Sequence, residues 1–104
     1  MATVTVLYPK ETKFDMSYYK ATHMPLVHKH WQSYGLESWK ISTISDEKSP
    51  YSVQASLEWK SVAAFHEAGK NEEVKKIIFG DIPNFSDQSP TILVAEKVFT
   101  DKDI

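Results

Sequence analysis

The stretch FDMSYYKATHMPLV, residues 14–27, is the most informative part of the chain, because it holds a helix start, two adjacent tyrosines and a histidine within an apolar pattern. Asp15 is well placed to cap the helix by accepting hydrogen bonds from amides of the first turn. Phe14 and Tyr19 flank this cap at the spacing of a hydrophobic staple. The pattern predicts a helix over residues 15–34, which the following glycine ends.

His23 lies at the centre of the apolar stripe of this predicted helix, flanked by Met16, Tyr19 and Val27 at helical spacing. A buried imidazole needs a hydrogen-bond partner, so two interpretations stand side by side. In one, His23 is a core residue whose ring is satisfied by a carbonyl or a tyrosine hydroxyl. In the other, it faces a pocket as a general base or hydrogen-bond donor, a role that its near-neutral pKa suits. Pro25 removes one helical hydrogen bond, and a bend there would shift the faces beyond it.

Four strands are predicted, and period-two alternation of apolar and polar residues is clear in two of them, residues 2–8 and 51–59. Two further helical segments begin at Ser61 and Asn71, which suit N-caps, and break near glycines. The expected strands cover residues 2–8, 38–45, 51–59 and 91–99, and the later helices cover residues 61–68 and 71–80.

The order β-α-β-β-α-β is that of the ferredoxin-like fold, an α+β class with a four-stranded antiparallel sheet. At 104 residues the chain is expected to form a single domain, residues 1–104. Helices would cover one face of the sheet only. We therefore expect a homodimer, in which a second copy covers the other face.

Composition excludes several function classes. The chain carries 12 basic and 14 acidic residues, a net charge of −2, and no basic stripe, which argues against nucleic acid or anionic membrane as a partner. It has no cysteine, so disulfides and thiolate chemistry are absent. No apolar run approaches the roughly 20 residues of a membrane helix, and the N-terminus predicts a strand rather than a signal peptide. A cytoplasmic location is expected.

Three segments resemble the EthD-like family, which is named for an ethyl tert-butyl ether degradation protein. They are VTVLYP (residues 4–9), FDMSYYKATHMPLV (residues 14–27) and DIPNF (residues 81–85), and they follow the order of the family's motifs. The resemblance implies a dimeric α+β barrel with a ligand pocket between helices and sheet. Many relatives have a glycine before Phe14, where this chain has residues 10–13, KETK. That loop is therefore expected to differ in shape.

The resemblance also implies candidate functions. Relatives include monooxygenases and dehydratases that act on aromatic polyketides without a cofactor, as well as proteins with no assigned activity. We therefore expect an apolar pocket for a hydrophobic, aromatic or polyketide-like molecule, with oxygenation and dehydration both open. A non-catalytic binding or accessory protein is the main alternative, and a purely structural dimerisation module is a third.

Candidate site residues follow from these expectations. His23 and Tyr19 share a helix face and are the predicted catalytic residues, as proton acceptor and proton donor. Residues expected to contact or orient the ligand are Asp81, Asn84, Trp59 and Tyr8. No metal site is expected, because no pair of histidines lies at convincing ligand spacing. No heme or other cofactor is expected, since the resemblance is to the heme-free branch.

Overall fold

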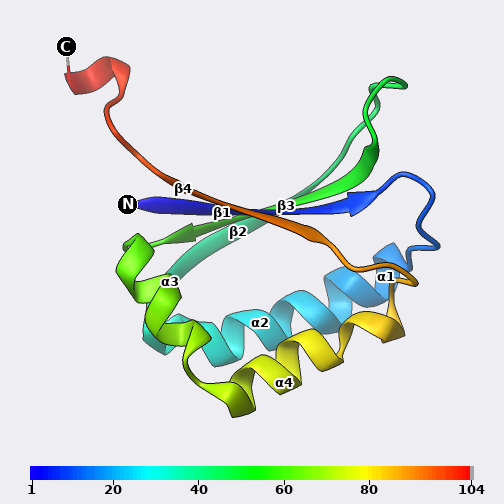
Figure 1. Ribbon diagram of the computed structural model, residues 1–104, viewed down its shortest axis with the longest axis horizontal. Coiled ribbons are helices and arrows are strands. Elements are labelled where there is room, and N and C mark those ends of the chain that lie inside the picture. Colours follow the sequence, from blue (N-terminus) through cyan, green and yellow to red (C-terminus); the bar gives the residue numbers. More distant parts are fainter. Residues whose placement is uncertain (104) are drawn as a thin grey trace.

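The computed structural model describes residues 1–103 as one sheet with helices along one face (Figure 1). The strands are β1 (Ala2–Pro9), β2 (Leu36–Thr43), β3 (Tyr51–Trp59) and β4 (Thr91–Glu96). The longer helices are α2 (Met24–Trp31), α3 (Val62–Gly69) and α4 (Glu72–Gly80). Short helical turns are α1 (Met16–Tyr18), η1 (Tyr19–His23), η2 (Gln32–Tyr34), η3 (Ile82–Asn84) and η4 (Asp101–Asp103).

The sheet order is β2-β3-β1-β4, and every neighbouring pair is antiparallel. The predicted α+β, ferredoxin-like arrangement is therefore confirmed. β1 and β3 occupy the centre, where both edges of each strand are hydrogen-bonded. β2 and β4 are the edge strands.

The two faces of the sheet differ in polarity, as the alternation predicts. Val4 pairs with Leu57 on one side and with Val94 on the other, so this row of apolar side chains faces the helices. On the opposite face, the Thr3 hydroxyl donates to both carboxylate oxygens of Glu58, at 2.9 and 3.0 Å. The core therefore lies between the sheet and the helices, and the open face is mostly polar.

The first helical segment starts as predicted but is not a uniform α-helix. The Asp15 side chain accepts from the Tyr18 amide and caps it. Over Tyr19–His23 the chain makes a π-helical turn, in which the Met24 amide donates to the Tyr19 carbonyl. This wider turn comes immediately before Pro25, where the α-helical ladder must lose one hydrogen bond. This turn brings Met24 into the core, where it is 2% exposed. Uniform helical spacing would instead place Met24 outside the apolar stripe.

The later helices begin at the predicted caps. Ser61 accepts from the Ala64 amide, and Asn71 accepts from the Val74 amide. The predicted bounds of β2 and β4 are wrong at their ends, because β2 covers Leu36–Thr43 and β4 stops at Glu96. β4 stops there because its partner β1 begins at Ala2, so no strand remains to pair with the chain beyond.

Gly35 is the one glycine with a positive φ, 126°, among the described residues. It ends the first helical segment, and a Cβ atom there would lie 3.0 Å from the Ala64 Cβ. We expect Gly35→Ala to lower the free energy of unfolding by about 1–3 kcal/mol, measured by urea denaturation. Gly69→Ala is the matched control, because nothing lies within 4 Å of its added Cβ. Equal stability of the two variants would contradict this prediction.

No helix within residues 1–103 is both long enough and apolar enough to cross a membrane.

Candidate functional site

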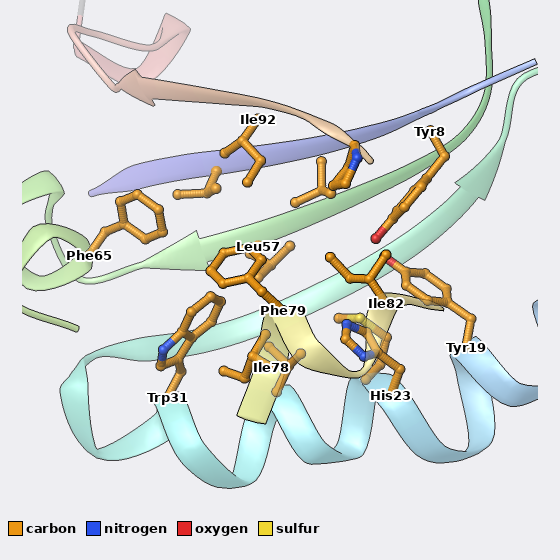
Figure 2. Close-up of a pocket in the computed structure, with 15 residues that line it drawn as sticks. Tyr8, Tyr19, His23, Trp31, Leu57, Phe65, Ile78, Phe79, Ile82 and Ile92 are labelled. Atoms are coloured by element: carbon orange, nitrogen blue, oxygen red, sulfur yellow. The ribbon is translucent and has the colours of Figure 1, made fainter. Parts of the chain in front are cut away.

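An apolar cavity of about 40 Å³ lies between the sheet and the helices. Figure 2 shows that its lining comes from both layers, with Tyr8, Tyr19 and His23 at one end and Trp31 and Phe65 at the other. The full lining is Val4, Val6, Tyr8, Tyr19, His23, Met24, Val27, Trp31, Leu57, Phe65, Ile78, Phe79, Ile82, Pro90 and Ile92. The polar side-chain atoms at the first end are thus the reactive groups of an otherwise apolar chamber.

These three polar residues are almost fully buried. Tyr8, Tyr19 and His23 are 1%, 2% and 4% exposed. The Tyr19 and His23 rings stack with centroids 5.4 Å apart, and the Tyr8 and Tyr19 rings meet edge-on at 5.8 Å. Burial raises the pKa of both tyrosine hydroxyls above the ordinary value, so both stay protonated near neutral pH.

His23 is held by a carboxylate behind the cavity wall. Its Nδ1 lies 2.9 Å from Oδ2 of Asp81, which directly precedes η3. The other carboxylate oxygen of Asp81 accepts from the Tyr18 hydroxyl at 2.7 Å and from the Asn84 side-chain amide at 3.0 Å. Tyr18, Asn84 and Asp81 thus form a hydrogen-bonded chain that ends on the imidazole.

The electrostatics of this chain set the state of the imidazole. Burial acts to raise the pKa of the Asp81 carboxyl, but hydrogen bonds from Tyr18, Asn84 and His23 outweigh it, and the pKa lies below its usual range. Asp81 is therefore ionised near neutral pH and accepts the Nδ1 proton of His23. Burial lowers the pKa of His23, and the contact with Asp81 opposes this only in part. The ring is thus neutral near pH 7, which leaves Nε2 unprotonated and able to accept a proton.

A cluster of aromatic rings joins the two sequence segments that build the site. The Phe85 ring lies 4.4 Å from the His23 ring and 4.8 Å from the Tyr19 ring, centroid to centroid. The Asp15 amide donates to the Phe85 carbonyl at 2.8 Å, and Phe14 forms a β-bridge with Ser86. The segment before the first helix and the loop after α4 are thereby held together, with Asp81 beside His23.

The predicted site residues fall into three groups. Tyr8, Tyr19 and His23 line the cavity. Asp81 and Asn84 lie behind its wall, where Asp81 contacts His23. Trp59 was expected to contact a ligand, but it is 0% exposed and does not belong to the cavity lining.

Sequence reasoning missed Tyr18. Uniform helical spacing points it about 100° away from its neighbour Tyr19, and so out of the pocket. In the structure Tyr18 does point away from Tyr19, toward the loop after α4, where its hydroxyl donates to Asp81. The adjacent pair of tyrosines before a histidine was the available signal.

No group of three or more histidine, aspartate or glutamate side chains within residues 1–103 is arranged to hold a metal ion.

Acidification is expected to destabilise the fold through His23. Its folded-state pKa lies below the ordinary 6.5, so the unfolded chain binds more protons in the interval between the two values. The stability contributed by neutral His23 is complete above pH 6.5 and is lost as the pH falls toward the folded-state pKa. Thermal melts from about pH 7.5 to about pH 5.5 should show this loss, and His23→Gln should flatten it. The same slope in native and variant chains would assign it to other groups.

Comparisons with known proteins bear on the fold. No family model matches the chain, and no curated protein matches it either. An EthD-like protein from Ralstonia eutropha JMP134 superposes with a TM-score of 0.78 at 24% identity, over 99% of this chain and 96% of that one. An ethyl tert-butyl ether degradation family protein from Bacillus halodurans C-125 gives 0.71 at 22% identity, over 94% and 99%. The chain has the fold of EthD-like proteins.

The EthD-like fold predicted from the three sequence segments is therefore confirmed over nearly the whole length of the chain. A more distant structure with this architecture comes from Nitrosomonas europaea, and its assignment as an antibiotic biosynthesis monooxygenase is provisional. It has a TM-score of 0.54 at 8% identity, over 95% of this chain and all of that one. At these identities the similarity concerns the fold alone.

Proposed function

We propose that this EthD-like chain is a cofactor-independent enzyme that acts on an aromatic or polyketide-like molecule, with His23 as the general base. One observation carries the proposal: a neutral imidazole in the wall of an apolar cavity has its Nδ1 held by Asp81 at 2.9 Å. A carbonyl or a hydroxyl would be enough to satisfy a histidine that only packs, whereas here the partner is an ionised carboxylate that Tyr18 and Asn84 also hold. The arrangement suits a base whose second nitrogen is free to accept a proton.

The chemistry begins with proton transfer. His23 Nε2 removes a proton from a phenol or from a carbon next to a carbonyl, and Asp81 stabilises the imidazolium that forms. Tyr19 or Tyr8, protonated at neutral pH, can donate a hydrogen bond to the developing oxyanion. Surrounding apolar side chains exclude water, so these interactions are stronger than they would be in solvent.

Two reactions can follow from the resulting anion. In oxygenation, it reacts with O₂, a CH₂ group becomes a carbonyl, and the second oxygen atom leaves as water. In dehydration, it expels a hydroxyl group from the neighbouring carbon, and the proton that His23 removed is returned to complete the water that leaves. The provisional monooxygenase name of the Nitrosomonas europaea protein supports considering the first reaction for this fold.

A binding or accessory protein for a hydrophobic small molecule is the second candidate. What favours it is the lining of the cavity: apart from the two tyrosines and His23, every lining residue is apolar. Such a lining gives affinity through burial alone. This candidate predicts binding without product.

Ligand-dependent thermal stabilisation tests the site. The native chain and His23→Ala would be heated with a panel of phenols, quinones and anthrone-type polyketides. A ligand at about 100 times its dissociation constant adds about 2.7 kcal/mol of stability. Compounds that stabilise the native chain more than the variant, and that are converted on incubation in air, support the enzyme. Binding without conversion favours the accessory protein, and no stabilisation by any compound overturns both.

We also propose that the chain works as a homodimer that pairs through the open sheet face and edge strand β4. Leu93 points to that face and is 51% exposed, and Val98 and Phe99 beyond the strand are 87% and 66% exposed. An exposed apolar edge of this kind favours pairing with another chain. Light scattering at micromolar concentration should give twice the mass of 11.9 kDa, and a monomer would contradict the proposal.

A further inference from the structure

A second hollow adjoins the cavity on the outside of the molecule. It is an open groove of about 340 Å³, lined by Phe79, Ile82, Pro83, Ser89, Pro90 and Ile92. Four of these residues, Phe79, Ile82, Pro90 and Ile92, also line the inner cavity. We call these four the shared wall, because they separate the two hollows.

The inner cavity is too small for the ligands that its chemistry suits. It measures about 40 Å³, whereas an apolar cavity known to bind benzene measures about 150 Å³. A ring system can therefore occupy the site only if the shared wall gives way and the space of the groove is added. The groove is much the larger of the two hollows, so it can hold most of the volume of such a ligand.

The shared wall contains the two most exposed residues of the cavity lining. Phe79 in α4 and Ile92 in β4 are 37% and 38% exposed, whereas most of the lining is buried. Figure 2 draws Phe79 and Ile92 on different elements, one from the helical layer and one from the sheet. Phe79 meets Trp31 edge-on at 6.3 Å, its only aromatic contact among the described residues. The Phe79 ring is therefore only loosely packed, and its rotation would open the wall without moving the backbone.

The backbone beside the wall is held firmly. Asp81 lies between Phe79 and Ile82 in the chain, and its carboxylate is bonded to Tyr18, Asn84 and His23. A large displacement of this segment would pull Asp81 away from His23. Side-chain rotation of Phe79 is therefore the route that leaves the site assembled.

We propose that the groove is the entrance and the outer half of the ligand site, with Phe79 as its gate. This rests on the proposed function only in placing the reactive end of the ligand at His23. No charged side chain lines the groove, and Ser89 is its one hydroxyl-bearing residue. The ligand class is therefore an uncharged, flat molecule of two or more fused rings. The end of this molecule farthest from His23 would lie in the groove between α4 and β4. A single-ring compound fills only a small part of the groove, so it buries less surface and binds more weakly.

The experiment follows the binding of 2-naphthol and of phenol by stopped-flow tryptophan fluorescence, since Trp31 lines the cavity. Phe79→Ala should raise the association rate of 2-naphthol about tenfold, because the gate no longer has to rotate. Ile92→Trp should slow it by filling the opening. Ile77→Ala is the matched control: Ile77 is on the same helix, is equally exposed at 37%, and lines neither hollow.

The outcomes separate this proposal from the proposed function. The gate is supported if 2-naphthol associates faster with Phe79→Ala while Ile77→Ala keeps the native rate, and if phenol binds more weakly than 2-naphthol. This holds even if no product forms. The proposal is overturned if the association rate of 2-naphthol is unchanged in Phe79→Ala or rises equally in Ile77→Ala. It is also overturned if 2-naphthol does not bind. Circular dichroism of each variant verifies folding, and Phe79→Leu replaces Phe79→Ala if the latter is unfolded.

Discussion

Replacing His23 by alanine is expected to lower the turnover of any compound that the native chain transforms by about 100- to 10,000-fold, the usual contribution of a general base. The physical reason is that no other group in the cavity can accept a proton near neutral pH. The other two polar residues of the lining are tyrosines whose pKa is raised by burial. Steady-state rates on a substrate found by thermal shift provide the measurement.

Two variants separate proton transfer from mere packing. Tyr18→Phe keeps the size of the ring but removes its hydrogen bond to Asp81. It should shift the pH profile of turnover and the NMR titration of His23 while the fold is retained. His66→Ala is the control, since His66 is exposed on α3 and does not line the cavity. Native turnover in His23→Ala would remove the proposed role of His23.

Trp59→Ala is expected to lower the free energy of unfolding by about 3–5 kcal/mol, the largest stability loss predicted for this chain. Trp59 is 0% exposed at the end of β3, with ring centroids 5.4 Å from Trp31 and 5.3 Å from Phe65. Removing the indole leaves a cavity that the rigid sheet cannot close. Urea denaturation of native and variant chains measures the difference.

Matched controls show whether buried volume is the cause. Trp39→Ala removes the same side chain from edge strand β2, where it is only half-buried, and should cost less. Trp59→Phe should also cost less than Trp59→Ala, because the ring fills much of the space. The Nε1 atom of Trp59 has no hydrogen-bond partner within the described residues, so its loss breaks no bond there. Equal losses in Trp59→Ala and Trp39→Ala would show that burial is not decisive.

Local patterns were predictable because their physical causes lie within a few residues. Each helix cap is local: the side chain accepts a hydrogen bond from the backbone amide three residues further along. The capping residues are Asp15, Ser61 and Asn71. Strict alternation over residues 51–59 determined which side chains of β3 enter the core. The order of the strands and helices then predicted the ferredoxin-like topology.

The end of β4 was not predictable from its own residues. Val98 and Phe99 are residues that favour strands, so the sequence predicted a longer strand. A strand persists only where a neighbour offers hydrogen bonds, and β1 begins at Ala2, opposite Glu96. The limit of β4 is therefore set by a residue more than ninety positions away.

The arrangement of helices and strands and the central position of His23 could be predicted from the residues alone, because periodicity and capping act over short distances along the chain. The contacts of His23 could not be predicted in this way, because they come from residues far away in the chain. Asp81 lies 58 residues further along the chain, and Tyr18 reaches it because a π-helical turn and a folded loop bring the two segments together. Partners so distant meet only when the whole core packs, so the state of the imidazole is a property of the assembled molecule.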